Sequence, residues 1–162
     1  MLVNGRERLA CRTRLVDLGV ATLQIAPLRN LPVVKDLIVD LVPFFEKWNA
    51  VGVAVPLQNG EAKPVGAGAQ REIDAHADCI TCALCYSACD AVSHAAGFLG
   101  PAALNRAYTL QLDARDAAHA VRAIRIDADA GVARCHSMGQ CTAVCPKGLD
   151  PLGAMAALKR GV

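Results

Sequence analysis

Seven of the eight cysteines in this 162-residue chain fall into two groups whose spacing suits a cluster of metal ions. The first group has the pattern C-x2-C-x2-C-x3-C, and its members are Cys79, Cys82, Cys85 and Cys89. The second group consists of Cys135, Cys141 and Cys145. Thiolates at this spacing, on a loop that turns into a helix, converge on one side of a cluster that needs several soft anionic ligands. The spacing therefore predicts two iron–sulfur clusters in one small domain.

The expected ligands follow from an exchange of cysteines between the two groups. In paired runs of this type, the fourth cysteine of a run binds the cluster of the other run. The first cluster, a [4Fe–4S] cluster, is then expected to be held by Cys79, Cys82, Cys85 and Cys145. The second cluster is left with Cys89, Cys135 and Cys141.

Met138 stands where the second group would carry its missing cysteine. A thioether does not replace a thiolate on iron, so the second cluster has three cysteine ligands. Three cysteines suit a [3Fe–4S] cluster or a [4Fe–4S] cluster with one open iron, and we expect the [3Fe–4S] form.

The composition limits the classes of protein and partner. Hydrophobic residues make up 54% of the chain, which is enough for a buried core. The formal net charge is only +2, so nucleic acid is not expected as a partner. The local basic feature is interpreted as a solvated face, formed by Arg6, Arg8, Arg12 and Arg14.

The cysteine content also bears on the compartment. Disulfides would need an oxidising compartment, but no signal peptide precedes the cysteines, and their grouping favours metal in a reducing compartment. No apolar run approaches the ~18 residues that a membrane span needs. Any membrane association is therefore expected to come through partners.

The first half of the chain is expected to combine short strands with one helix. Residues 1–30 are interpreted as strands and turns, with a tight turn at Asn4-Gly5 before a strand at Leu9-Ala10. A helix is predicted to begin at Pro43. Residues 51–75 are rich in Gly, Pro and Ala and are interpreted as a linker. The residues assigned to the helical apolar stripe are Leu37, Leu41, Phe44, Phe45 and Trp48.

The second half is expected to be helical around the cysteine groups. One helix is predicted to begin at Gly100-Pro101, and a last one at Pro151 with Asp150 as its N-cap. A further helix is predicted to present the apolar face Ala117, Val121 and Ile124. His76 and His119 lie in no motif and are interpreted as surface residues.

With these residues in place, the chain resembles the iron–sulfur subunit of succinate dehydrogenase and fumarate reductase. The resemblance covers nearly the whole chain, and its motifs are residues 27–37, 79–89, 97–103, 113–116 and 135–151. It implies a mostly α fold, with a bacterial-type two-cluster (7Fe) ferredoxin-like α-helical domain over residues 76–162. A remnant of a plant-type β-grasp ferredoxin domain over residues 1–32 and a connecting helix and linker over residues 33–75 would precede it.

The resemblance implies an electron-transfer subunit that does no substrate chemistry itself. An FAD-containing flavoprotein partner would oxidise succinate or, in the reverse direction, reduce fumarate. Electrons would pass through a [2Fe–2S], a [4Fe–4S] and a [3Fe–4S] cluster to ubiquinone or menaquinone at membrane-anchor subunits. The chain would then be peripheral on the inner side of an energy-transducing membrane, either the mitochondrial inner membrane or the bacterial cytoplasmic membrane.

The resemblance also assigns Cys11 as one ligand of the [2Fe–2S] cluster. The family's other three ligands would precede Met1. We expect a naturally split subunit whose separate ferredoxin-like half supplies them, and a misplaced start is the alternative. If the assignment fails, Cys11 is a buried free thiol.

Four residues are candidates for the quinone end by position in the family. His136 and Lys159 fall where quinone-contacting residues occur, and His94 replaces a tryptophan. A histidine or lysine beside a quinone can donate a hydrogen bond and supply protons. Asp90 replaces a proline after Cys89, and its charge is expected to lower the potential of the second cluster.

Two other classes of protein share features of this cysteine pattern. Iron–sulfur subunits of the glycolate oxidase and heterodisulfide reductase types also use paired cysteine runs. Residues 4–11 and 27–37, together with Met138 in place of a cysteine, favour the succinate dehydrogenase family instead. A zinc-binding module needs four thiolates at each tetrahedral site, and seven cysteines do not divide into two such sites.

Overall fold

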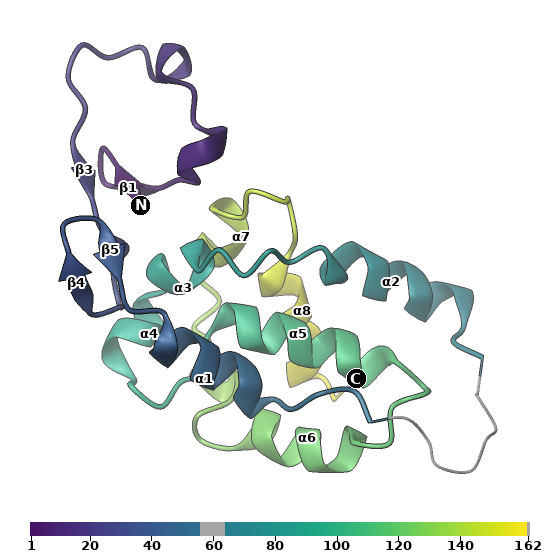
Figure 1. Cartoon of the computed structure of the whole chain (residues 1–162). Coiled ribbons are helices and arrows are strands. Elements are labelled where there is room, and N and C mark those ends of the chain that lie inside the picture. The colour runs from purple at the N-terminus through teal and green to yellow at the C-terminus, as the bar shows by residue number, and fades with distance from the viewer. Residues whose placement is uncertain (56–63, 162) are drawn as a thin grey trace.

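The computed structural model describes residues 1–55 and 64–161, and its largest part consists of helices packed around α5 (Pro101–Leu112). α5 contacts α1, α2, α3, α6 and α8 (Figure 1). The other long helices are α1 (Val42–Ala50), α2 (Ala67–Ala77), α6 (His119–Asp127) and α8 (Pro151–Lys159). The short helices are α3 (Leu84–Ser87), α4 (Asp90–His94) and α7 (Gln140–Ala143). Single 3-10 turns cover Ala10–Arg12, Leu15–Leu18 and Val132–Arg134. The expected mostly helical character is confirmed.

The sequence of α5 explains its central place. Pro101 lies in its first turn, and Gly100 before it has a φ of +86°. A Cβ at Gly100 would lie 3.0 Å from the ring of Tyr86, so only glycine lets the helix begin there without displacing that ring. Small side chains then allow neighbouring helices to approach closely, and the buried ones are Ala102, Ala103 and Ala107. The predicted start at Gly100-Pro101 is confirmed.

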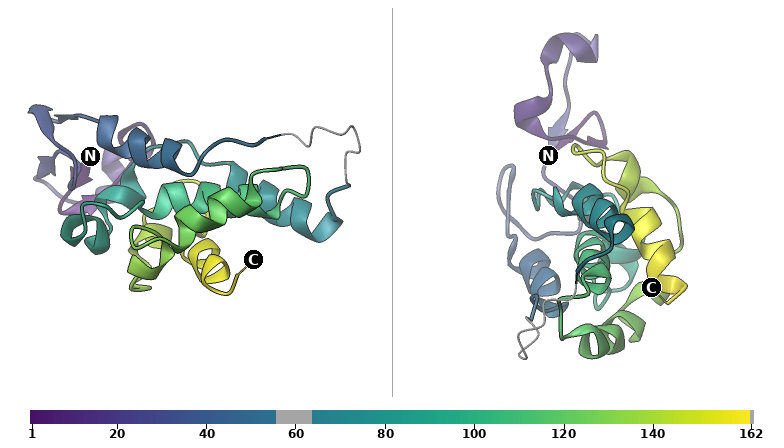
Figure 2. Two further views of the ribbon diagram at one scale, coloured as in Figure 1. Left: turned by 90° about the horizontal axis from the view of Figure 1, so that it is seen from below. Right: turned by 90° about the vertical axis from the view of Figure 1, so that its right-hand side faces the viewer.

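The N-terminal part is a small antiparallel sheet in the order β2-β1-β3. Its strands are β1 (Leu2–Val3), β2 (Arg6–Glu7) and β3 (Ile25–Ala26). Asn4 and Gly5 both have positive φ, which confirms the predicted tight turn. The strand predicted at Leu9-Ala10 is wrong, because β2 follows the turn directly and Ala10 begins a 3-10 turn. Figure 2 shows this part projecting away from the helices.

A buried carboxylate attaches the N-terminal part to α3. Glu7 Oε1 accepts hydrogen bonds from Ser87 Oγ at 3.0 Å and from Arg29 Nη2 at 2.7 Å. Asn30 Nδ2 lies 3.1–3.2 Å from three carbonyl oxygens, those of Tyr86, Ser87 and Cys89. These contacts hold the N-terminal part directly against the first cysteine group.

A hairpin of β4 (Val33–Lys35) and β5 (Ile38–Val39) leads into α1. The assignment of Leu37 to the helical stripe is wrong, because the residue lies in the hairpin turn and is 40% exposed. Apolar spacing alone does not detect the left-handed turn at Asp36. The predicted start near Pro43 is confirmed, and Phe44 packs edge-on against Tyr86 with ring centroids 5.6 Å apart.

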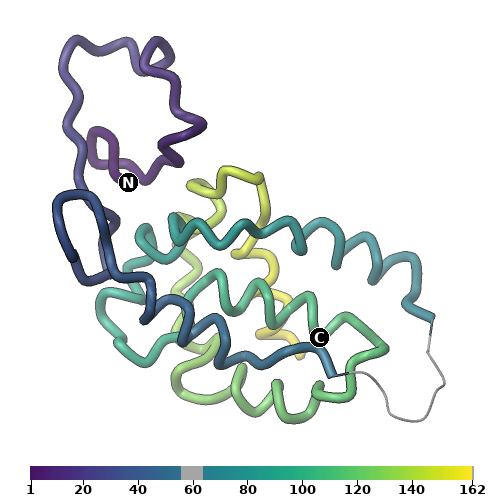
Figure 3. Tube along the Cα trace, viewed as in Figure 1, coloured from purple at the N-terminus to yellow at the C-terminus, as the bar shows by residue number. Residues whose placement is uncertain are grey.

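The linker predicted over residues 51–75 is wrong for its last part. Residues 67–75 belong to α2, which runs beside α5 and leads into the first cysteine group (Figure 3). Alanine is a strong helix former, and packing against α5 supplies the stabilisation that composition does not reveal. Residues 56–63 of the predicted linker lie outside the described residues.

The predicted buried face of α6 is also wrong. Val121 is 59% exposed and Ile124 is 72% exposed, whereas the residues buried from this helix are Arg122 and Ile126. The guanidinium of Arg122 forms an ion pair with Asp116, in which both side chains are 1% exposed. A buried arginine with a carboxylate partner thus occupies the position that apolar spacing assigned to aliphatic residues.

The predicted N-cap of α8 is confirmed. Asp150 Oδ1 accepts hydrogen bonds from Gly153 N at 3.0 Å and from Thr142 Oγ1 at 2.7 Å, which joins α8 to α7. These two bonds outweigh burial and lower the pKa of Asp150. We expect Asp150→Ala to reduce the free energy of unfolding by about 1 kcal/mol at neutral pH.

The pH dependence of this cap follows from the direction of the pKa shift. A carboxyl group whose pKa is lowered by folding stabilises the fold above its unfolded pKa and loses that contribution as pH falls through the folded pKa. Urea unfolding of Asp150→Ala and of the parent protein at neutral and acidic pH measures the pH dependence of this contribution. The control is Asp127→Ala, because Asp127 is exposed at the end of α6. A difference between Asp150→Ala and the parent that stays constant down to pH 2 would contradict this origin.

Candidate iron–sulfur centres

The two cysteine groups adopt the same backbone conformation position by position. The first loop has left-handed residues at Thr81 and Ala83, and the second has them at Ser137 and Gly139. A four-residue helix follows each loop, α3 after the first and α7 after the second, and the two helices lie against each other. In this correspondence Met138 occupies the position of Cys82, as the spacing predicted.

The left-handed residues turn backbone N–H groups toward the sulfurs. Ser137 N lies 3.4 Å from Cys135 Sγ, and the N–H of Thr81 stands in the same relation to Cys79. Successive N–H groups in such turns form a concavity that binds anions, iron–sulfur clusters among them. Each loop therefore offers both thiolates and hydrogen-bond donors to an anionic cluster.

The seven cysteines line two separate cavities. We call the first cavity A; the cysteines that line it are Cys79, Cys82, Cys85 and Cys145. We call the second cavity B; its cysteines are Cys89, Cys135 and Cys141. Cys145 therefore lies with the first group and Cys89 with the second, and all seven are free thiols.

Burial raises the pKa of five of these thiols, namely those of Cys79, Cys82, Cys85, Cys89 and Cys141. The pKa of Cys85 lies well above its ordinary value because of burial, and nearby cysteines from both cavities raise it further. Burial likewise raises the pKa of Cys141 to about 11, with additional contributions from Cys89 and Cys135. The thiols of Cys85 and Cys141 are therefore protonated at neutral pH, and a bound metal cluster would displace the proton. Cys85 lies on α3 and Cys141 lies on α7, and these two helices contact each other, so the two cavities are neighbours.

The donor sets fit polynuclear clusters. Within residues 1–55 and 64–161, no three His, Cys, Asp or Glu side chains are placed to hold a single metal ion. A cluster several atoms across keeps its ligands further apart than one ion does, so four thiols around one cavity and three around another suit iron–sulfur groups.

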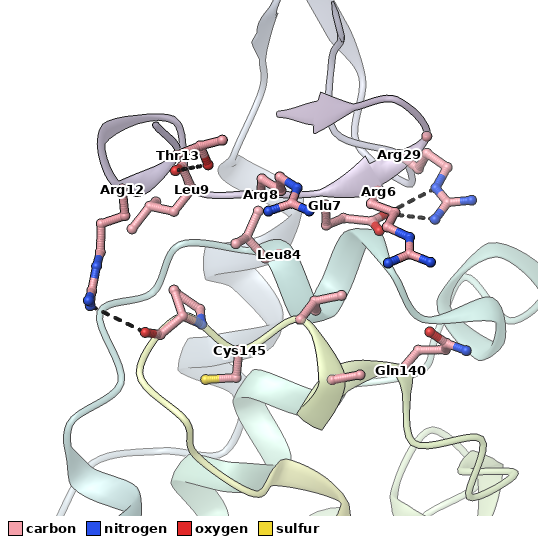
Figure 4. Close-up of a pocket in the computed structure, with 14 residues that line it drawn as sticks. Arg6, Glu7, Arg8, Leu9, Arg12, Thr13, Arg29, Leu84, Gln140 and Cys145 are labelled. Carbon is pink, nitrogen blue, oxygen red and sulfur yellow. Dashed lines mark hydrogen bonds and ion pairs between the residues drawn. The ribbon is translucent and has the colours of Figure 1, made fainter. Parts of the chain in front are cut away.

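A third cavity, of about 670 Å³, separates the N-terminal part from the helices (Figure 4). Its basic side chains come from Arg6, Arg8, Arg12 and Arg29, and Cys145 forms part of its opposite wall. Arg12 Nη1 crosses it to donate to Pro146 O at 3.4 Å. Cys11 is exposed beside this cavity, in the 3-10 turn that contains Arg12. The solvated basic face inferred from the sequence therefore partly lines this cavity.

The candidates for the quinone end differ in their distance from cavity B. Asp90 and His136 line it. Lys159 reaches its edge, where Nζ donates to Cys135 O at 2.6 Å. His94 is exposed at the end of α4 and does not line the cavity.

The sequence interpretation missed two polar pairs. His76 was expected at the surface but is only 7% exposed, and Asn105 on α5, which lines cavity A, is 1% exposed. The buried pair Asp116–Arg122 was missed as well. Of these two pairs, only Asp116–Arg122 had a signal in the sequence, because Asp116 is the last residue of the family motif at residues 113–116. His119, also expected at the surface, is half-buried, with Nε2 bonded to backbone carbonyls.

Within the described residues, no helix is both long enough and apolar enough to cross a bilayer.

Two parts of the chain match families of iron–sulfur domains. Residues 75–149 match the family described as a 4Fe-4S dicluster domain. Residues 1–46 match the family described as a 2Fe-2S iron-sulfur cluster binding domain. The first match includes all seven grouped cysteines, and the second includes Cys11.

Whole-chain relatives agree with these matches. The chain is 38% identical to the fumarate reductase iron-sulfur subunit of Mycobacterium tuberculosis, over 98% of this chain and 66% of that protein. It is 36% identical to the mitochondrial succinate dehydrogenase (ubiquinone) iron-sulfur subunit of Dictyostelium discoideum, over 98% of this chain and 60% of that protein. The chain thus spans 60–66% of the length of these relatives.

A solved structure gives the same result. A chain of the Mycobacterium smegmatis Sdh1 complex in the apo form matches with a TM-score of 0.85 at 28% identity, over 98% of this chain and 69% of that chain. The recognition made from motifs is therefore confirmed, and this chain belongs to the family of iron–sulfur subunits of succinate dehydrogenase and fumarate reductase.

Proposed function

We propose that this chain is the electron-transfer subunit of a succinate:quinone oxidoreductase, holding a [4Fe–4S] cluster in cavity A and a [3Fe–4S] cluster in cavity B. The observation that carries the proposal is the division of seven free cysteines into four around one cavity and three around the other. When bound, the clusters supply one-electron redox chemistry at sulfur-ligated iron. The chain itself contributes ligation, burial and electrostatics.

The order of the centres follows from the shared walls of the cavities. Cys145 lines both cavity A and the cavity that faces the N-terminal part. The charge interaction between Cys85 and Cys141 joins cavity A to cavity B. Electrons therefore travel from the N-terminal part through cavity A to cavity B, or along the same path in reverse when fumarate is reduced.

Cys11 supplies one ligand of a [2Fe–2S] cluster at the start of this path. The match of residues 1–46 to a 2Fe-2S domain supports the assignment. The other ligands come from outside these 162 residues, for which a separate ferredoxin-like half-subunit is one source. An FAD-containing flavoprotein is the partner at this end.

The quinone end lies at cavity B, beside membrane-anchor subunits. His136, Ser137 and Met138 are exposed at the rim of this cavity, and Lys159 is anchored on Cys135 O. An imidazole and an ammonium group there can donate hydrogen bonds to ubiquinone or menaquinone and supply the protons that its reduction needs. Asp90 lines the same cavity and contributes polarity there, whereas His94 lies exposed at the end of α4. The complex is then peripheral to the inner side of an energy-transducing membrane.

Met138→Cys provides the sharpest test of the cluster assignment. A thiolate at this position corresponds to Cys82 and completes a four-cysteine set around cavity B, so the variant is expected to bind [4Fe–4S] there. Protein assembled anaerobically with iron and sulfide should show the electron paramagnetic resonance (EPR) signal of an oxidised [3Fe–4S] cluster. The variant should lose this signal and contain one more iron per chain.

Met138→Ser serves as the control, because it removes the thioether without adding a thiolate ligand. It should keep the [3Fe–4S] signal and the iron content of the parent protein. A parent protein that binds zinc and no sulfide, or that lacks a [3Fe–4S] signal, would overturn the proposal.

A further inference from the structure

A buried histidine and a buried asparagine face each other beside cavity A. His76 on α2 is 7% exposed and Asn105 on α5 is 1% exposed, and Asn105 lines the cavity together with the four cysteines. The ring of His76 also packs edge-on against Tyr108, with centroids 5.2 Å apart. An ionisable ring in this position adds nothing to cysteine ligation, so its presence in the interior calls for another role.

The hydrogen bonds between the pair determine which ring nitrogen holds a proton. Asn105 Nδ2 lies 3.0 Å from the backbone carbonyl oxygen of His76, which can only accept, so this atom is the amide nitrogen. Asn105 Oδ1 lies 2.7 Å from His76 Nδ1 and can only accept, so Nδ1 carries a proton in both charge states of the ring. Nε2 is therefore the atom that gains a proton when His76 becomes charged.

Several charged or titratable groups lie on the elements that carry or adjoin the pair. They are Glu72 and Asp78 on or beside α2, Tyr108 on α5, Lys147 before α8, and Asp150 and Arg160 at the ends of α8. Tyr108 Oη donates to Glu72 at 3.3 Å, and Lys147 pairs with Asp78 at 3.1 Å, so these four groups are partnered. The charge interaction with His76 lowers the pKa of Asp150, although the hydrogen bonds from Gly153 and Thr142 lower it more.

We propose that His76, connected to cavity A through Asn105, makes the reduction potential of the cluster in that cavity depend on pH. The inference rests on the cluster assignment under the proposed function. Reduction adds a negative charge to the cluster, and a positive charge on a nearby buried ring stabilises the reduced form. By linkage, reduction raises the affinity of His76 for a proton to the same extent. The potential therefore falls as pH rises, and electron entry is coupled to proton uptake at Nε2.

The test is a redox titration of the assembled protein followed by EPR between about pH 5.5 and 8.5, which spans the ordinary histidine pKa of about 6.5. In the parent protein, the midpoint potential of the cavity A cluster should fall with rising pH. In His76→Phe, which keeps an aromatic ring against Tyr108, it should be independent of pH over this range. His119→Gln replaces a histidine that lines neither cysteine cavity and should retain the parent curve.

A second variant lowers the risk of a failed fold. His76→Phe leaves Asn105 Oδ1 without a partner, so the double variant His76→Phe/Asn105→Leu, which removes both polar partners, is made alongside it. If neither variant assembles, nuclear magnetic resonance of the parent protein with labelled histidine measures the pKa of His76 in the oxidised and reduced states. A higher pKa in the reduced state supports the inference, and an unchanged pKa overturns it.

The outcomes separate this inference from the cluster assignment. A parent protein without a four-iron signal overturns the assignment and the inference with it. A parent protein with both cluster signals but a pH-independent potential, or a His76→Phe variant with the parent's pH dependence, overturns the inference alone. The cluster in cavity B, titrated in the same sample, should keep the same potential in every variant.

Discussion

Cys145→Ser is expected to abolish the [4Fe–4S] cluster of cavity A and to leave the cluster of cavity B in place. Cys145 follows Cys141 by four residues, so proximity in sequence alone would predict loss of the second cluster. The side chain instead lies with Cys79, Cys82 and Cys85 in cavity A. A serine hydroxyl is a poor ligand for iron, so the variant keeps three thiolates at cavity A, a set that suits a [3Fe–4S] cluster in place of the four-iron form expected in the parent protein.

The matched control for this change is Cys141→Ser, from the same loop. It should remove the [3Fe–4S] EPR signal and leave the signal of the reduced four-iron cluster. Iron analysis should then give four irons per chain for Cys141→Ser, whose cavity B keeps only two thiolates, and at most six for Cys145→Ser, which should lack the signal of the reduced four-iron cluster. The same cluster lost in both variants would contradict the exchange of cysteines between the loops.

Asp116→Ala is expected to reduce the free energy of unfolding by about 3–5 kcal/mol, because it leaves the buried guanidinium of Arg122 without its counter-charge. Asp116 Oδ1 also accepts from Val55 N at 2.8 Å and from Ala118 N at 3.0 Å. Arg122 donates in turn to Val51 O and Val53 O, each at 3.0 Å. Through these hydrogen bonds, the pair connects the segment after α1 with the loop between α5 and α6.

The same pair should make stability sensitive to acid. Burial raises the pKa of Asp116, but hydrogen bonds from Val55 and Ala118 and the charge of Arg122 outweigh it, and the net shift is downward. A lowered pKa means that the stabilisation is present at neutral pH and is lost as pH falls below the ordinary aspartate value of about 3.9 and through the folded pKa.

Urea unfolding followed by circular dichroism under anaerobic conditions measures both effects. Asp113→Ala is the control, because Asp113 pairs with Arg115 at the surface, where an ion pair contributes about 0–1 kcal/mol. The double variant Asp116→Ala/Arg122→Met, which leaves no unpaired charge, should recover part of the loss. Equal effects of Asp113→Ala and Asp116→Ala would contradict the proposed role of the buried pair.

Local sequence signals correctly predicted where several helices begin. Pro43, Gly100-Pro101 and Asp150 each act through their own backbone or side chain, and the structure begins a helix at each. The errors arose where tertiary packing determined whether a segment is helical or which face of a helix is buried. Residues 67–75 became helical against α5, and α6 buried Arg122 in place of Val121 and Ile124.

The sequence by itself determined the cluster chemistry proposed for this protein and the division of its cysteines, because ligand type and spacing along the chain carry that information. The predicted sets are the sets that line cavities A and B, while ligation itself stays a prediction. Only the tertiary structure brought His76 to Asn105 and Asp116 to Arg122 in the interior. Such pairs depend on which faces of separate helices meet and on how much water is excluded between them, and no local pattern of residues encodes either.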